Sequence, residues 1–118
     1  MNERIVLDHV TMVASDLSAS QRFYDAALAP LDISRVFDFP DATGYGGSDG
    51  KPDFWIIAGD PVSTGVHIAF VARTRALVET FHHAAVAAGG TSLHTPQEWP
   101  AGRALLISRY RASGSCRI

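Results

Sequence analysis

The chain has 118 residues, of which 47% are hydrophobic, and a formal net charge of −2. This length suits one small domain with a core, and the nearly balanced charge gives no reason to expect nucleic acid or an acidic membrane surface as a partner. The single cysteine, Cys116, excludes an internal disulfide framework. No apolar run approaches the roughly 20 residues that cross a bilayer, and residues 1–10 lack the basic start and cleavage site of a secretory signal. A cytoplasmic protein is therefore expected.

The first half of the chain predicts a strand, a helix and three further short strands. Residues 4–13 are rich in β-branched and apolar side chains, which favours a strand. Alternation along that strand puts four side chains on one face, namely Leu7, His9, Thr11 and Val13. Residues 16–28 are predicted to be a helix, capped by Asp16 or Ser15 and followed by Pro30. The later expectations are a strand at 33–39, a thin strand or loop around 44–47, a turn at Asp49–Gly50 and a strand at 54–57.

The second half repeats the first at an offset of 58 residues. Over residues 9–29, 7 of 21 positions are identical to their counterparts. Two of the identical pairs are His9/His67 and Phe23/Phe81. The repeat predicts a strand at 64–72 and a helix that is capped by Thr74 and stopped by two glycines. We therefore expect one domain, 1–118, made of two modules at about 1–60 and 61–118.

The repeat fails at the C-terminus. Shifted by 58, the apolar strand 54–57 falls on Ala112-Ser113-Gly114-Ser115, and four of the nine arginines lie in 103–117 with no acid after Glu98. Two explanations stand side by side: the tail is read out of frame or is otherwise not the ancestral ending, or it is a divergent edge strand. In either case we expect the last eight residues to be poorly packed compared with 52–58.

Two strings resemble the glyoxalase/bleomycin-resistance/extradiol-dioxygenase superfamily, also called vicinal oxygen chelate. They are LDHVTMVASDLSASQRFYDAALAPL and TGVHIAFVARTRALVETFHHAAVAAGG, and the resemblance covers residues 4–95. It implies an α+β fold in which paired βαβββ modules form an open, cup-shaped sheet around one metal, here with an aberrant last strand. It also implies a homodimer.

The resemblance places metal ligands at His9 and His67, the equivalent histidines of the two modules. Two imidazoles suit a divalent ion such as Fe, Mn, Zn or Ni. The family's glutamate on the fourth strand is replaced here by the apolar residues 54–57, and the last strand carries no glutamate. The third ligand and the general base are therefore unassigned, and metal affinity is expected to be weak.

Five further residues are candidates for a substrate pocket, although core packing is an alternative for the aromatic ones. They are Thr11, Tyr45, Trp55, Ala69 and Trp99. His82 and His83 lie in the predicted second helix, away from the cup, which favours a solvated or dimer-facing role. Cys116 has no neighbouring histidine to activate it as a nucleophile.

Three functions remain open at this point. The first is a metalloenzyme acting on a small vicinal-oxygen substrate, like lactoylglutathione lyase or an extradiol dioxygenase. The second is a non-catalytic, ligand-sequestering protein of the bleomycin-resistance type. The third is a family member inactivated by its altered C-terminus. One fold hosts many chemistries, so the resemblance alone does not choose among them.

Overall fold

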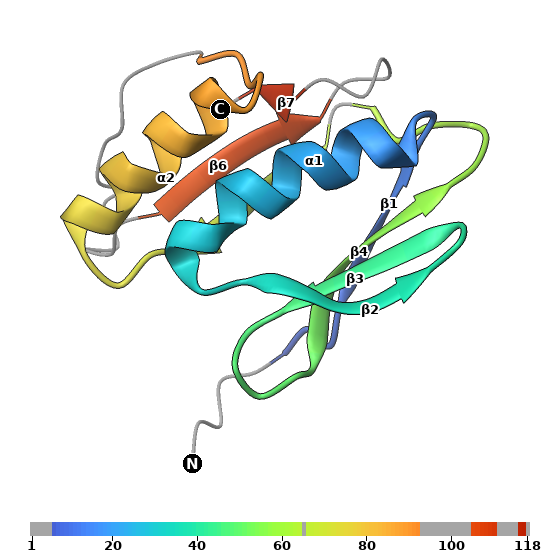
Figure 1. Ribbon diagram of the computed structural model, residues 1–118, viewed down its shortest axis with the longest axis horizontal. Helices are drawn as coiled ribbons and strands as arrows, with labels where there is room; N and C mark the ends of the chain where they lie inside the picture. The colour runs from blue at the N-terminus through green and yellow to red at the C-terminus, as the bar shows by residue number, and fades with distance from the viewer. Residues whose placement is uncertain (1–5, 65, 93–104, 111–115, 118) are drawn as a thin grey trace.

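The computed structural model describes residues 6–64, 66–92, 105–110 and 116–117 (Figure 1). For His67 and for the residues from 105 onwards, only the backbone is described. The first half of the chain contains β1 (Val10–Ala14), α1 (Leu17–Leu28), the short 3-10 helix η1 (Ala29–Leu31), β2 (Ser34–Phe39), β3 (Ala42–Gly46) and β4 (Pro52–Ala58). The four strands form one sheet in the order β1-β4-β3-β2, in which β1 and β4 are parallel and the other pairs antiparallel. This is the expected βαβββ module.

The second half begins in the same way and then diverges. It contains β5 (His67–Val71), α2 (Arg75–Ala87), β6 (Leu105–Tyr110) and β7 (Cys116–Arg117). Its described strands form a sheet in the order β5-β6-β7, and both pairings are antiparallel. In the first module, by contrast, the first strand pairs in parallel with the last strand. The α+β fold of glyoxalase type is confirmed, and the second module departs from the first after its helix. The packing expected of the last eight residues lies outside the described side chains.

The 58-residue repeat is visible in the helices. Asp16 caps α1 by accepting a hydrogen bond from the Ala19 N–H, and Thr74, 58 residues later, caps α2 by accepting one from the Leu77 N–H. Each helix begins at the next residue. The paired positions Phe23/Phe81 and Ala27/Ala85 are all buried. Capping and the spacing of the apolar face therefore specify both helices locally.

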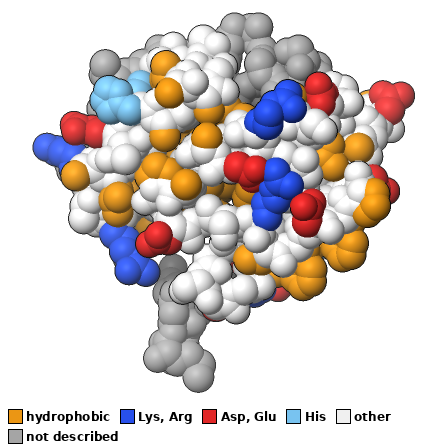
Figure 2. Space-filling view, in the orientation of Figure 1, with side chains coloured by type: hydrophobic (Ala, Val, Ile, Leu, Met, Phe, Trp, Pro, Cys, Tyr) orange, Lys and Arg blue, Asp and Glu red, His pale blue; other side chains and the backbone are white. Residues whose placement is uncertain are grey.

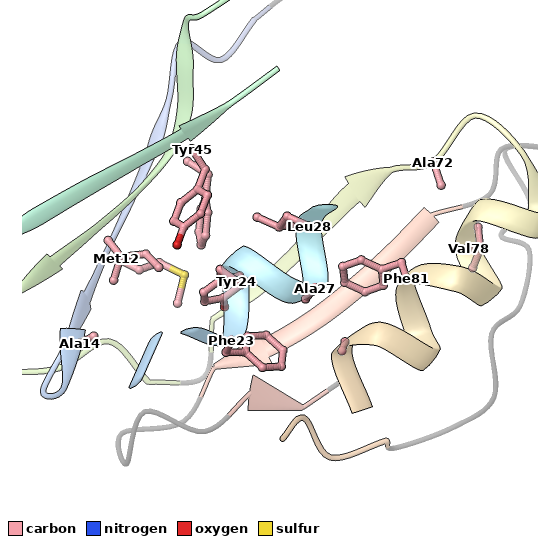
Figure 3. Close-up of a cluster of buried hydrophobic side chains, with 13 residues drawn as sticks. Met12, Ala14, Phe23, Tyr24, Ala27, Leu28, Tyr45, Ala72, Val78 and Phe81 are labelled. Carbon is pink, nitrogen blue, oxygen red and sulfur yellow. The ribbon is translucent and has the colours of Figure 1, made fainter. Parts of the chain in front are cut away.

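The two modules share one hydrophobic core, which α1 and α2 cover from one side of the sheets (Figures 1 and 3). Tyr24 of α1 meets the Phe54 ring at a centroid distance of 5.0 Å, and Phe54 meets Phe70 of β5 at 5.4 Å. Phe70 in turn lies 6.4 Å from Phe81 of α2. Continuous aromatic contact from one module to the other fixes their relative placement.

The segment between the modules covers the outer edge of β1. The Ser63 N–H donates to the Val13 carbonyl at 3.0 Å, and the Val13 N–H donates to the Ser63 hydroxyl at 2.9 Å. The Gly59 N–H donates to the Ala14 carbonyl. The outer backbone groups of Val13 and Ala14 are therefore satisfied, whereas β2 forms the opposite edge of the sheet.

Two boundaries differ from the sequence expectation. The predicted strand 4–13 begins only at Val10, because the ladder with β4 begins at the pair Val10/Phe54. The stretch expected to be a thin strand or loop is the full strand β3, paired on both sides. The tight turn is present, with Gly50 at a φ of 77° and its N–H bonded to the Gly47 carbonyl.

Candidate functional site

The four-stranded sheet has one buried face and one open face. On β1, Met12 is buried beneath the helices while Thr11 is exposed, and on β4, Ile56 is buried while Trp55 is only partly covered. Side chains alternate between the two faces of a strand. We call the side turned away from the helices the open face. The expected facing of β1, with Thr11 on this side and Met12 on the other, is observed.

Three aromatic rings stack on the open face. Phe37 and Phe39 of β2 lie 6.0 and 6.4 Å from Trp55, with interplanar angles of 22° and 16°, and 6.1 Å from each other. Phe37 is 45% and Phe39 50% exposed. We call these three residues the aromatic surface. Exposed apolar side chains gathered in this way commonly mark a binding site.

Local backbone features place these rings together. The β2–β3 register shifts between Arg35 and Phe37, which turns Phe37 to the open face opposite Gly44. A Cβ at Gly44 would lie 3.0 Å from atoms of the Trp55 ring. The absence of a side chain there lets the indole lie across β3. The sequence reasoning missed Phe37 and Phe39, although their period-two spacing in a predicted strand was a usable signal.

A charged cluster lies where β1 and β4 begin. His9 Nδ1 is 2.7 Å from Asp8 Oδ2, and Lys51 Nζ lies 2.9 Å from Asp53 Oδ1 and 3.4 Å from Asp8 Oδ1. Hydrogen bonding to His9, followed by the contact with Lys51, lowers the pKa of the Asp8 carboxyl. Hydrogen bonding to Asp53 is the main cause that raises the pKa of the Lys51 ammonium. Asp8 therefore remains anionic and Lys51 cationic near neutral pH.

The predicted pocket residues fall into separate places. Thr11 lies directly beside Trp55 in the β1–β4 register, so both are on the open face. Ala69 is exposed on β5, in the second sheet. Trp99 lies outside the described residues, and for His67 the structure gives only a backbone position at the start of β5. The structure therefore brings Thr11 and Trp55 together and leaves a meeting of His9 with His67 as a prediction.

Of the two readings of Tyr45, pocket residue or core residue, the structure agrees with the core, because Tyr45 faces the helix and not the open face. Its side chain is fully buried, and its hydroxyl donates to Asp25 Oδ1 at 2.9 Å. Burial, then the hydrogen bond to Asp25, raise the pKa of Tyr45. The reason is alternation: Gly44 and Gly46 hold the open-face positions on either side of it. Tyr45 is thus a core residue of the α1–β3 contact.

The described side chains do not by themselves fit a metal ion. Among the residues whose side chains are described, no group of three or more His, Cys, Asp or Glu is placed to hold one. Asp8, whose carboxylate contacts His9, is also in contact with Lys51. A metal centre at His9 would therefore need ligands from outside this part of the chain, of which His67 is the first candidate.

A separate cavity of about 810 Å³ lies at the junction of the two modules. It is lined by the β3–β4 turn, the end of β5 and the start of α2, and Leu31, Val71 and Arg73 are among its residues. None of the predicted site residues lines it. The open face and this cavity are therefore distinct regions of the surface.

A βαβββ module followed by a second strand–helix unit, with a shared core beneath two helices and an exposed sheet face, defines a class of proteins, the glyoxalase-like fold. Comparison with solved structures agrees. A glyoxalase/bleomycin resistance protein from Albidiferax ferrireducens T118 superposes with a TM-score of 0.71 at 25% sequence identity, over 94% of this chain and 94% of that one. No protein-family model and no curated protein matches the sequence. This structural match supports placing the chain in the glyoxalase/bleomycin-resistance, or vicinal oxygen chelate, superfamily. Among the described residues, no helix is long and apolar enough to cross a membrane.

Proposed function

We propose that the protein binds a planar, largely apolar small molecule on its open face, stacked against the aromatic surface of Phe37, Phe39 and Trp55. The observation that carries this proposal is the near-parallel stacking of three partly exposed rings. A flat ligand laid on such a surface removes apolar area from water and gains ring-to-ring contact. The superfamily includes ligand-sequestering members as well as enzymes, so a binding protein is consistent with the fold.

The charged cluster indicates which charge the ligand should carry. Asp53 lies two residues before Trp55 on the same face of β4, which at 3.3 Å per residue is about 7 Å along the strand. Two carboxylates, Asp8 and Asp53, are present there against one ammonium, Lys51. A ligand with a planar apolar body and a basic or hydrogen-bond-donating end fits this arrangement better than an anionic one.

A titration with two planar dyes tests the proposal. Proflavine, a planar cation, should bind more tightly than 8-anilinonaphthalene-1-sulfonate, an anion, when each is followed by fluorescence. Trp55→Ala should weaken proflavine binding about tenfold, since a lost stacking contact and its buried area are worth roughly 1–2 kcal/mol. Trp55→Phe should retain most of the affinity because it keeps a ring.

The matched control is Val86→Ala, which removes a hydrophobic side chain of α2 that is 41% exposed and lies away from the open face. It should leave dye binding unchanged. Equal affinities for the parent protein, Trp55→Ala and Val86→Ala would show that the aromatic surface is not the binding site.

A second candidate is a metalloenzyme that uses His9 and His67, of the lactoylglutathione-lyase or extradiol-dioxygenase type. One observation favours it: Asp8 accepts from His9 Nδ1, which leaves Nε2 as the available metal ligand. A bound divalent ion would polarise the oxygens of a substrate. If this candidate is correct, His9→Ala and His67→Ala each abolish binding of Mn(II), and ligand turnover depends on the metal. Dye binding that is unaffected by a chelator and by both substitutions would favour the binding protein.

A further inference from the structure

We propose that the Lys51 ammonium is an internal cation of the open face, which occupies the oxygen-lined space between Asp8 and Asp53 and holds His9 in position without a metal ion. The proposal goes beyond ligand binding, because it assigns a role to a residue outside the aromatic surface. It also accounts for the poor fit of the described side chains to a metal centre.

Three oxygen atoms converge on the ammonium. They are the Asp8 carbonyl oxygen at 2.5 Å, Asp53 Oδ1 at 2.9 Å and Asp8 Oδ1 at 3.4 Å. An ammonium group has three N–H donors and no acceptor, so three acceptors around it match its bonding capacity. Carbonyl and carboxylate oxygens are also the ligands that hard divalent cations prefer. Lys51 therefore lies where such a cation would otherwise be attracted.

The same contacts reach His9. The two oxygens of the Asp8 carboxylate have different partners. Oδ1 lies near Lys51, and Oδ2 accepts a hydrogen bond from His9 Nδ1 at 2.7 Å. One chain of contacts thus runs from Asp53 through Lys51 and Asp8 to His9. Its members come from segments 43 residues apart in the sequence. Because a carboxylate that is held by a cation has fewer orientations, Lys51 limits the positions open to the imidazole.

The position of Lys51 in the fold explains why a side chain is needed to hold the segment that carries His9. The β1–β4 ladder begins at Val10 and Phe54, so the chain that carries His9 enters the sheet before any described strand pairing holds it. Lys51 precedes Pro52, the first residue of β4, and bridges to Asp8 across this gap. Lys51 is therefore a positioning residue for His9.

The experiment measures the affinity for Mn(II) by the electron paramagnetic resonance signal of the free ion. In Lys51→Met the ammonium is lost but most of the stem remains, so Mn(II) should bind about tenfold more tightly than in the parent, since a unit positive charge no longer opposes the ion within about 4 Å. Lys51→Arg keeps the positive charge and should bind Mn(II) as weakly as the parent. Adding Asp53→Asn or His9→Ala to Lys51→Met should reverse the gain.

Lys51→Gln is the second neutral variant, and thermal unfolding of each variant shows that it is folded. An affinity in both neutral variants no higher than in the parent would overturn the proposal, as would an equal gain in Lys51→Arg. The outcome is separable from the proposed function, because Lys51→Met leaves the aromatic surface intact and Trp55→Ala leaves the charged cluster intact. A negative result for one proposal therefore does not decide the other proposal.

Discussion

At the scale of single residues, one ionic network links α1 to the first sheet. Arg35 of β2 donates through Nε and a terminal nitrogen to the two oxygens of Asp25, and Tyr45 donates to the same carboxylate. Arg35 also contacts Asp38 at 3.2 Å. The space-filling view shows acidic and basic side chains adjacent to one another on this side of the molecule (Figure 2). A two-point guanidinium–carboxylate contact supported by a buried hydroxyl is geometrically specific, so this network helps to set the angle of α1 on the sheet.

The same network predicts a pH dependence of stability. Burial opposes ionisation of Asp25, but hydrogen bonds from Arg35 and Tyr45 outweigh it and lower the pKa of the carboxyl below its ordinary 3.8. A carboxyl with a lowered folded-state pKa stabilises the protein above the unfolded-state pKa, and that contribution disappears as the pH falls through the folded-state value. Asp25→Asn should therefore reduce the free energy of unfolding by about 1–2 kcal/mol at pH 7 and by much less near pH 2.

Urea unfolding at the two pH values measures this difference. Asp38→Asn is the control, because its carboxylate is more exposed and makes one longer contact with Arg35. It should change stability by less than about 0.5 kcal/mol at either pH. A loss in Asp25→Asn that is the same at pH 2 as at pH 7 would show that the carboxylate charge is not what stabilises this contact.

At the scale of elements, two neighbouring glycines at the end of β3 are expected to behave differently. A Cβ at Gly46 would lie 2.1 Å from the Lys51 carbonyl oxygen, a backbone atom that cannot move without displacing the start of β4. Gly47 has no atom within 4 Å of the corresponding position. Gly46→Ala should lower the free energy of unfolding by about 3 kcal/mol, while Gly47→Ala should change it by less than about 0.5 kcal/mol. Equal unfolding midpoints in urea would contradict the close approach of the two strands.

The elements also show how much of the fold could be predicted from the sequence. Both helices were predictable, because Asp16 and Thr74 are local capping signals that precede an apolar stripe. The facing of β1 followed from alternation alone. The aromatic surface did not, because the register shift in β2 and the absent side chain at Gly44 decide which rings meet. Such facts depend on strand pairing, which a single sequence does not specify.

The candidate site was predictable to a similar extent. The repeat identified His9 and the resemblance gave it a role, but the contact of Lys51 with Asp8 depends on a parallel pairing between β1 and β4. Tyr45 could not be assigned to a face because the sequence left β3 undecided between a strand and a loop. Once β3 is a paired strand, Tyr45 and the two flanking glycines must lie on opposite faces.

At the scale of the whole molecule, the two modules are unequal. The fully or nearly buried residues of the first module include Met12, Tyr45, Phe54 and Ile56 on three strands. The second module pairs β5 with β6 in the opposite direction from the β1–β4 pair, so its sheet does not reproduce the first. Among the described residues of the second module, no parallel strand corresponds to β4, the strand that supplies Phe54 and Ile56 to the core of the first module. The sequence repeat and the repeated topology therefore both break down after the helix of the second module.

We predict that the chain forms a homodimer. The β2 strand is an edge of the first sheet, and the partly exposed Phe37 and Phe39 lie on it. An edge with unpaired backbone groups and adjacent apolar side chains favours contact with a second copy of the chain. Sedimentation velocity at micromolar concentration should show a species of twice 12.7 kDa. Phe39→Glu should shift it towards the monomer by placing a charge in the contact, whereas Val86→Glu on α2 should not. A single 12.7 kDa species of the parent chain, or an equal effect of the two substitutions, would contradict an interface at β2.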